Sequence, residues 1–286
     1  MEKRVVGVIG GTGLYQIEGL EKVREVEVDT PFGRPSDAYV TGTLDGTDFV
    51  FLPRHGKGHR LLPTELNFRA NIFGMKRLGV GEIISVSAVG SLSEEIEPGH
   101  VVVPDQFIDR TTQRQSTFFG QGIVAHVGFA DPFCPVLRQA VFRAAEEEGA
   151  RVHPRGTYVC MEGPQFSTRA ESHLYRSWGA HVIGMTNLQE AKLAREAEIC
   201  FVTLALATDY DCWSESAGDV EIEQVMAIIQ KNVRLAQQVI RKAIAYFPKE
   251  RSCACATSLK DAIVTERGRI PEKSRKDLEI IIGKYL

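Results

Sequence analysis

The chain has few cysteines, little net charge and no long apolar run. Six cysteines scattered over 286 residues do not form the disulfide framework of a small secreted protein. A formal net charge of −3 gives no general attraction to nucleic acid or to an anionic membrane. No apolar run is long enough to cross a bilayer, and the segment MEKRVVGVIGGTGLY lacks the apolar stretch of a signal peptide. We therefore expect a cytoplasmic protein that binds neither nucleic acid nor membrane.

Internal repeats, low-complexity tracts and linkers are also missing. Hydrophobic residues make up 43% of the chain and charged residues 25%, which is ordinary for a globular protein. The length suits one large α/β domain or two small ones. Because no boundary is evident, we expect a single domain over residues 1–286, with a C-terminal helical segment at about 250–286.

Short apolar runs alternate with helical patterns along the chain. The longest run, residues 199–207, suits a central strand that is covered on both faces, as in α/β folds with parallel pairing. Capping-box spacing at Thr168 and Glu171, and again at Thr186 and Gln189, predicts helices that follow these threonines. The polar residues 105–119 are predicted to form a long loop. The other predicted strands are 5–9, 49–52, 82–86, 101–103, 156–161 and 181–184, with hairpin strands within 30–48, and the other predicted helices are 65–78, 135–149, 220–246 and one after Pro271.

Two carboxylates follow the predicted central strand. Asp209 and Asp211 are two residues apart, so in an extended chain they face the same way, at the strand end where ligands of α/β sheets bind. Crowding and burial raise the pKa of one such acid, so that the pair shares a proton. One carboxyl can then donate to N7 of a 6-aminopurine while both accept from its exocyclic amine. A divalent metal and a solvated loop are the alternatives.

Other strand ends carry groups that suit an anion. Gly10–Gly13 is a glycine turn that brings backbone N–H groups, and the Thr12 hydroxyl, close to a ligand. The dinucleotide fingerprint is incomplete there, because Gln16 stands where the third glycine belongs. Arg54 can bind an oxyanion through two N–H groups, with His55 as a further donor. The small residues that begin at Ser87 again expose backbone amides and a hydroxyl at a strand end.

The cysteines form two groups in the sequence. Cys134, Cys160, Cys200 and Cys212 lie in apolar or mixed segments and are predicted to pack as small core residues; Cys253 and Cys255 form a Cys-Ala-Cys motif in a polar stretch. Two ligands are too few for a structural zinc site unless others join them, and a disulfide is the alternative. We expect a bland or stabilising role for this motif, not a catalytic one.

Six motifs together resemble the 5′-methylthioadenosine phosphorylase branch of the trimeric purine nucleoside phosphorylase family. The resemblance covers almost the whole chain up to about Lys249. It implies an α/β fold with a central mixed, twisted sheet flanked by helices. The motifs are Gly10–Gly13, Pro53-Arg54-His55-Gly56, Asp105 to Thr112, Asp131-Pro132-Phe133-Cys134, Glu162-Gly163-Pro164-Gln165-Phe166-Ser167 and Ala207 to Trp213.

The resemblance also implies the site. Asp209 and Asp211 are the expected readers of the base, with Asp209 as general acid, and His126 is expected to reach the pocket of a neighbouring subunit. Other nucleoside contacts are expected from Ala88, Phe166, Met185 and Thr186. Phosphate contacts are expected from Thr12, Arg54, His55, Ser87, Ala88, Ser167 and Thr186.

The implied reaction is phosphorolysis of 5′-methylthioadenosine to adenine and 5-methylthioribose 1-phosphate, a step of purine and methionine salvage. Inorganic phosphate is a co-substrate, and no metal or organic cofactor is expected. The resemblance also implies a homotrimer or a dimer of such trimers. The alternatives are a phosphorylase of 6-oxopurine nucleosides or of 5′-methylthioinosine and, from another class, a non-catalytic dinucleotide-binding module built on Gly10–Gly13.

Overall fold

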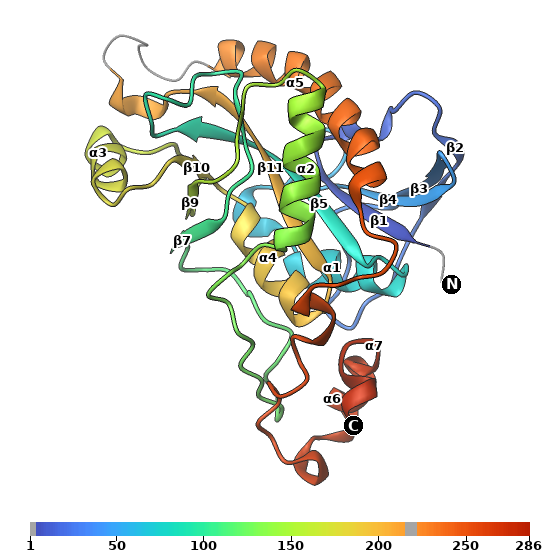
Figure 1. Cartoon of the computed structure of the whole chain (residues 1–286). Coiled ribbons are helices and arrows are strands. Elements are labelled where there is room, and N and C mark those ends of the chain that lie inside the picture. Colours follow the sequence, from blue (N-terminus) through green and yellow to red (C-terminus); the bar gives the residue numbers. More distant parts are fainter. Residues whose placement is uncertain (1–3, 215–221) are drawn as a thin grey trace.

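The computed structural model describes residues 4–214 and 222–286, and in them eleven strands form one mixed sheet (Figure 1). The main path runs β2-β3-β4-β1-β5-β10-β9-β7, and β11 pairs with β5 and β6 off this path, with β8 beyond β6. Helices cover both faces, so the predicted α/β class with a mixed central sheet is confirmed. The strands are β1 (Val5–Gly10), β2 (Glu21–Val26), β3 (Tyr39–Leu44), β4 (Thr47–Pro53), β5 (Glu82–Ser91), β6 (Val101–Val102), β7 (Gln106–Arg110), β8 (Val152–His153), β9 (Thr157–Met161), β10 (Val182–Gly184) and β11 (Cys200–Asp209).

Strand β5 pairs with other strands along both of its edges. One edge pairs with β11 along almost its whole length in parallel. The other edge pairs first with β1, ending at Ser85, and then with β10 in the antiparallel sense, beginning at Gly90. Residues 86–89 lie between these two ladders, so the backbone there is open to other groups. This interval is where the site described below is built.

The helices pack in two pairs against opposite faces of the sheet. On one face, α2 (Pro135–Glu147) and α5 (Ile222–Ala243) share an apolar core with β1, β4 and β11. On the other face, α1 (Phe68–Arg77) and α4 (Asn187–Glu196) close a second core. Strand β11 is buried at every position except Asp209, as expected for a strand covered on both sides. A further helix, α3 (Arg169–Ser177), lies near the outer edge beside β9 and β10 (Figure 1).

The chain after α5 consists of short helical turns. It includes α6 (Glu272–Asp277), α7 (Glu279–Ile282) and the 3-10 turns Ile244–Tyr246, Ala254–Thr257, Arg267–Arg269 and Gly283–Tyr285. Leu259, Leu278 and Ile282 from this segment enter the same core as α1 and α4. In Figure 1 the segment extends below the sheet together with the loop that follows β7. No helix in the described part of the chain is both long and apolar enough to span a membrane.

The structure differs from the sequence predictions at several elements. Strand β7 lies inside the predicted loop 105–119, because polar Gln106–Arg110 pairs with β9 at an edge and needs no apolar pattern. Strand β2, also on an edge, was not predicted. Helix α1 begins at Phe68 behind the Asn67 cap, after a 3-10 turn at Pro63–Glu65. The predicted helix 220–246 is α5 with the turn after it, and its residues 220 and 221 lie outside the described residues.

The two predicted capping boxes have different outcomes. At the start of α3 the box is confirmed, since the Thr168 hydroxyl accepts from the Glu171 N–H at 3.2 Å and the Glu171 carboxylate accepts from the Thr168 N–H at 2.8 Å. At the start of α4, Thr186 makes no side-chain cap bond, so the second box is wrong although the helix exists. Thr186 is buried, and its hydroxyl makes no hydrogen bond within the part of the chain that the structure describes.

Candidate active site

All but one of the sequence-predicted residues lie at or after the end of a strand or, in the case of Ser87 and Ala88, within strand β5. Asp209 closes β11, and Asp211 begins the 3-10 turn after it. Ser87 and Ala88 lie in the open interval of β5. The others follow their strands directly: Thr12 after β1, Arg54 and His55 after β4, Phe166 and Ser167 in the loop after β9, and Met185 and Thr186 after β10. The exception is His126.

Arg54 fills the start of the open interval in β5. Its Nη1 donates to the Val86 carbonyl at 3.0 Å, which takes the place of a strand partner. Its Nε donates to Glu190 Oε1 at 2.5 Å and its Nη2 to Glu190 Oε2 at 3.1 Å, so that guanidinium and carboxylate meet face to face. Burial lowers the pKa of Arg54, but the carboxylate of Glu190 outweighs it and the pKa is raised. The Arg54 guanidinium therefore stays charged although it is buried away from solvent.

A buried polar network holds this ion pair. The Ser85 hydroxyl donates to Glu190 Oε2 at 2.7 Å and accepts from Arg54 Nη2 at 2.6 Å. Asn187 Nδ2 also donates to Ser85, at 2.9 Å, and the Thr203 hydroxyl donates to Asn187 Oδ1 at 2.5 Å. These bonds join all the members to one another, which holds the network in one arrangement. Of the five N–H groups of Arg54, one on Nη1 has no partner among the described residues.

His55 is held as a neutral ring. Its Nδ1 lies 2.8 Å from the Leu61 carbonyl, which only an N–H can approach, so the proton is on Nδ1. Burial is the main cause that lowers the pKa of His55 to about 4, and the charge of Arg54 adds to it. The ring stacks on His59 with centroids 4.2 Å apart. In this state Nε2 is an acceptor, so His55 is not the additional donor that the sequence interpretation assigned.

The two aspartates meet in a tight turn and not in an extended chain. The Asp211 N–H donates to Asp209 Oδ1 at 2.8 Å, and the Thr208 hydroxyl donates to Asp209 Oδ2 at 2.7 Å. Asp211 has a φ of 50°, in the left-handed region. Its Oδ2 is buried and has no hydrogen-bond partner in the described part of the chain. A buried carboxylate oxygen without a donor is costly unless a ligand supplies one.

Burial raises the pKa of both acids. For Asp209 the bonds from Thr208 and from the Asp211 N–H oppose the rise. For Asp211 the negative charge of Asp209 adds to burial, while the nearby hydroxyls of Ser172 and Ser167 oppose it, although neither makes a hydrogen bond to Oδ2 in the described part of the chain. The negative charge of Asp209 beside Asp211 favours a state in which only one of the two carboxyls is ionised. The predicted sharing of a proton agrees with these directions.

Small residues let the neighbouring strands come close to the acids. A Cβ at Gly90 would lie 3.0 Å from Asp209 Oδ1 and 3.3 Å from the Asp211 Cβ. A Cβ at Gly184 would lie 1.9 Å from the Tyr158 hydroxyl, and that hydroxyl lies 3.1 Å from Ser87 Oγ. The sheet is therefore tightly packed beside Ser87, which is buried, whereas Ala88, the next residue of the strand, is exposed.

The loop after β9 borders the acids. The Cys212 S–H donates to the Ser167 carbonyl at 3.2 Å, which ties this loop to the turn that holds Asp211. Phe166 is 52% exposed, so its ring is uncovered and available for stacking. Met185 lies against Gly163, where a Cβ would lie 2.5 Å from its Sδ.

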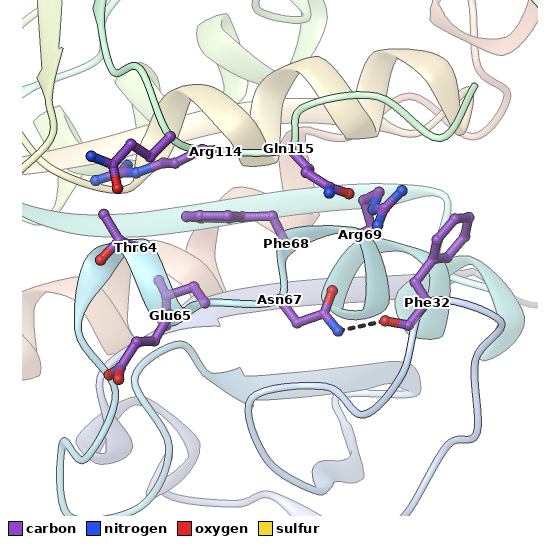
Figure 2. A pocket seen from close by; sticks show the side chains of 10 residues that line it. Phe32, Thr64, Glu65, Asn67, Phe68, Arg69, Arg114 and Gln115 are labelled. Carbon is purple, nitrogen blue, oxygen red and sulfur yellow. Dashed lines mark hydrogen bonds between the residues drawn. The ribbon is translucent and has the colours of Figure 1, made fainter. Parts of the chain in front are cut away.

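Arg114 is a buried hub that the sequence reading missed. Its Nε donates to Glu162 Oε1 at 3.0 Å, and its Nη1 donates to the carbonyl of Met185 and to Gln189 Oε1, the latter at 3.1 Å. It thereby joins the loops after β9 and β10. A pocket of about 330 Å³ lies beside it, between residues 64–69 and residues 113–115 (Figure 2). None of the predicted site residues lines this pocket.

His126 is the predicted residue that the chain does not bring to the site. Its side chain is exposed, and its N–H donates to the Ala262 carbonyl at 2.8 Å. It therefore belongs to the part of the molecule formed by the loop after β7 and the C-terminal segment. The Thr12 side chain lies outside the described part, so only its place after β1 is given.

Arg114, Glu190 and Asn187 are the main residues that sequence reasoning missed. One signal was present for two of them: Asn187 and Glu190 lie on the core side of α4, which shows four buried polar residues among its ten. A polar residue at an apolar position of a helix indicates a buried partner. Arg114 carried no such signal, because it lies in a polar segment without periodicity.

Comparisons with known proteins show the family of the chain. The family model described as "Phosphorylase superfamily" matches residues 5–245. An S-methyl-5′-thioadenosine phosphorylase of Geobacter sulfurreducens is 61% identical over 99% of this chain and 100% of its own. Another of Koribacter versatilis is 60% identical over 98% of this chain and 96% of its own.

Solved structures resemble the fold as closely. A methylthioadenosine phosphorylase from an Antarctic soil metagenomic library superposes with a TM-score of 0.93 at 48% identity, covering 98% of this chain and 99% of the other. A mutant adenosine/methylthioadenosine phosphorylase of Schistosoma mansoni, in complex with adenine, gives a TM-score of 0.83 at 37% identity, covering 87% and 93%.

The fold is thus that of a nucleoside phosphorylase. The chain belongs to the phosphorylase superfamily and, within it, to the S-methyl-5′-thioadenosine phosphorylases. The resemblance found in the sequence motifs is therefore confirmed.

Proposed function

We propose that this enzyme cleaves 5′-methylthioadenosine with inorganic phosphate, and that Asp209 and Asp211 recognise and protonate the adenine. The observation that carries the proposal is the unpartnered, buried Asp211 Oδ2 beside Asp209. An exocyclic amine supplies the missing donor, and a shared proton supplies a donor for N7. Relatives named for methylthioadenosine support the same substrate.

The base pocket distinguishes amino from oxo purines. A 6-amino group presents N–H bonds to Asp211, whereas a 6-keto oxygen would face an acceptor that already lacks a donor. The keto group would also leave Asp211 Oδ2 buried and unpaired, which costs about 1–3 kcal/mol. A 6-oxopurine nucleoside or 5′-methylthioinosine is therefore the less suitable substrate.

The phosphate is proposed to bind along the open interval of β5. The remaining N–H of Arg54, the hydroxyls of Ser87 and Thr186 and the backbone after Gly10 provide donors. His55 takes part as an acceptor, through Nε2, from a phosphate O–H. Ser167, Ala88 and Thr12 complete the set that the family resemblance implies, while Phe166 and Met185 contact base and sugar.

In the reaction the C1′–N9 bond breaks and its electron pair stays on the purine, which takes a proton at N7 from Asp209. A phosphate oxygen forms the new bond to C1′. Phosphate also stabilises the cationic sugar before it attacks. Holding both reactants in place supplies several kcal/mol of the barrier, on the order of 7. No metal or organic cofactor takes part in these steps.

We also propose that the pocket is completed by a second copy of the chain, in a trimer or a dimer of trimers. The support is that His126 is exposed and lies in the loop after β7, where its N–H is bonded to the C-terminal segment. A 5′ substituent is a suitable contact for such a residue. Light scattering should give the mass of about three chains or six, and a monomer that is fully active would contradict the proposal.

The decisive experiment for the reaction is product analysis with and without phosphate. We expect adenine release to depend on phosphate and to yield the sugar 1-phosphate. Matched panels of 6-amino and 6-oxo nucleosides, each with a 5′-methylthio or 5′-hydroxyl group, then rank the substrates. Phosphate-independent release of adenine would identify a hydrolase and overturn the proposal. Binding of NAD in calorimetry would instead favour the dinucleotide-binding alternative.

A further inference from the structure

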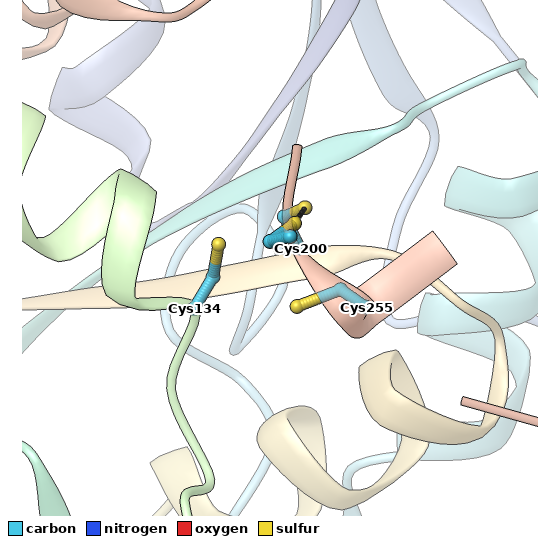
Figure 3. Close-up of side chains that lie close together, drawn as sticks. Cys134, Cys200 and Cys255 are labelled. Carbon is cyan, nitrogen blue, oxygen red and sulfur yellow. Dashed lines mark hydrogen bonds between the residues drawn. The ribbon is translucent and has the colours of Figure 1, made fainter. Parts of the chain in front are cut away.

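Four of the six cysteines meet at one point of the fold. Cys200 is the first residue of β11, Cys134 precedes α2, and Cys253 and Cys255 come from the segment after α5 (Figure 3). Their sulfur atoms all lie within 4.8 Å of one another, and all four are free thiols. The closest pair, Cys200 and Cys253, has sulfurs 3.2 Å apart. The sequence prediction that Cys134 and Cys200 are plain core residues is incomplete, since both join the Cys-Ala-Cys motif.

This spacing suits a tetrahedral metal ion. A zinc ion bound by four thiolates has Zn–S bonds of about 2.3 Å, which places the sulfurs roughly 3.8 Å apart. The observed sulfur–sulfur distances, from 3.2 Å to at most 4.8 Å, lie on both sides of that value. Only small side-chain movements are therefore needed to bring the four sulfurs to the corners of a tetrahedron. The condition stated for the motif, that two more ligands must join it, is met by Cys134 and Cys200.

The surroundings suit a charged metal–thiolate group. Cys134, Cys200 and Cys255 are buried in the core between α2, α5 and the sheet. Arg251 Nη2 donates to the Cys200 sulfur at 3.3 Å and to the Glu198 carbonyl at 2.8 Å. The Nε of Arg251 is buried without a partner in the described part of the chain. A tetrathiolate of zinc carries two negative charges, and a guanidinium beside it offsets part of them.

We propose that Cys134, Cys200, Cys253 and Cys255 bind one zinc ion as a closed, structural site. Four thiols lose their protons to solvent and four Zn–S bonds form, with no transfer of electrons. The site lies at the amino end of β11, whereas Asp209 lies at its carboxyl end. It therefore takes no part in phosphorolysis and instead fastens the C-terminal segment to the sheet.

Two disulfides are the competing arrangement of the same four cysteines. They need an oxidant and exclude the metal, because the sulfurs would be bonded to each other. The two states differ in mass, because each disulfide lacks two hydrogens that the thiols carry. They also differ in metal content, which makes the proposal directly testable.

The experiment uses the full chain, produced with zinc in the medium and purified in the presence of a reductant. Zinc is measured by inorganic mass spectrometry against protein concentration. We expect about one zinc per chain, and cobalt put in its place should give the visible absorption of a tetrahedral thiolate site. Cys134→Ser and Cys255→Ser should each lose most of the metal. Cys160→Ser, which changes a buried cysteine outside the group, should keep it.

The wild-type measurements alone can overturn the proposal, even if the serine variants fail to fold. Reduced wild-type protein that holds no zinc, and takes up cobalt without thiolate absorption, would exclude the site. So would a denatured, unreduced chain from a cytoplasmic preparation whose mass lacks four hydrogens. Removal of zinc by a chelator should also lower the Tm of wild-type protein and leave that of Cys255→Ser unchanged.

Discussion

Two buried pairs of ionisable side chains lie beside the same sheet and are built in opposite ways. Arg54 and Glu190 have opposite charges, and each is joined to the other and to Ser85. Asp209 and Asp211 have like charges, and Asp211 Oδ2 has no partner in the described part of the chain. Both pairs are removed from water, so each bears the cost of burying charge.

In the first pair the protein itself supplies the hydrogen-bond partners of the buried charges. In the second pair the missing donor must come from a ligand. A fully bonded buried ion pair is rigid, and breaking it leaves an uncompensated charge. An unsatisfied pair costs stability in the free protein and provides binding energy when donors arrive. Activity should therefore depend most on the aspartates, and stability most on Arg54 and Glu190.

The largest expected effect is that of Asp209→Asn on activity. The amide cannot give a proton to N7, and general acids of this kind contribute about 100- to 10,000-fold. We expect kcat/KM for 5′-methylthioadenosine to fall by that factor, with a relative gain for 6-oxo nucleosides. The free energy of unfolding should change by less than about 1 kcal/mol, because one of two like charges is removed.

The matched control for this variant is Asp45→Asn, which makes the same change at an exposed aspartate paired with Arg241. Its kcat/KM should equal that of wild type. An Asp209→Asn enzyme that keeps its rate and its preference for amino purines would show that the acids do not read the base.

The second prediction concerns stability. Glu190→Gln leaves Arg54 buried without its counter-charge, and breaking such pairs costs about 3–5 kcal/mol. Urea unfolding should show this loss. Glu25→Gln breaks the exposed pair with Lys57, whose side chains are 60% and 43% exposed, and should cost at most about 1 kcal/mol. Equal losses in the two variants would contradict the distinction between the charge pairs.

The third prediction tests a lone buried carboxyl, Glu196. Burial raises its pKa to about 7, although the Phe118 N–H and the Thr117 hydroxyl oppose the rise. Between pH about 4.5 and 7 the folded chain holds a proton that the unfolded chain has released, so stability falls as pH rises through this range. The fall is up to about 3 kcal/mol.

Glu196→Gln should remove this part of the pH dependence and leave a flatter curve of unfolding free energy between pH 5 and 8. Glu25→Gln serves again as the control, because an exposed glutamate should leave the slope unchanged. A slope in Glu196→Gln that equals that of wild type would show that this carboxyl is ionised in the folded protein.

The sequence predicted the strand ends well, because buried strands are continuous apolar runs and polar residues follow them directly. Asp209 and Arg54 were found in this way, whereas Ser87, predicted to follow a strand that ends at residue 86, lies inside β5, which continues to Ser91. Their partners were not, since Glu190 lies 136 residues from Arg54 and nothing local reveals the pairing. The same holds for the cysteines: Cys134 and Cys200 show no metal-ligand spacing in the sequence, and only the fold brings them to Cys253.

Local backbone conformation also limited what the sequence pattern could predict about the site. The spacing of Asp209 and Asp211 suggested neighbouring side chains in an extended strand, whereas the chain turns and the Asp211 N–H caps Asp209. The tautomer of His55 depends on the Leu61 carbonyl, which a sequence pattern does not place. Edge strands such as β7 stay hidden because exposed strands need no apolar residues.

The smallest expected effect is that of His126→Ala on KM. His126 contacts neither charge pair and was predicted from the family resemblance alone. If a neighbouring copy receives it near the 5′ group, His126→Ala should raise KM for 5′-methylthioadenosine by up to about tenfold, or ~1.4 kcal/mol. The kcat should hold, because such a contact is equal in ground and transition states. His173→Ala, an exposed histidine on α3, is the control. An unchanged KM would mean that the pocket is complete within one chain, and a lower kcat would place His126 nearer the reacting atoms than the fold suggests.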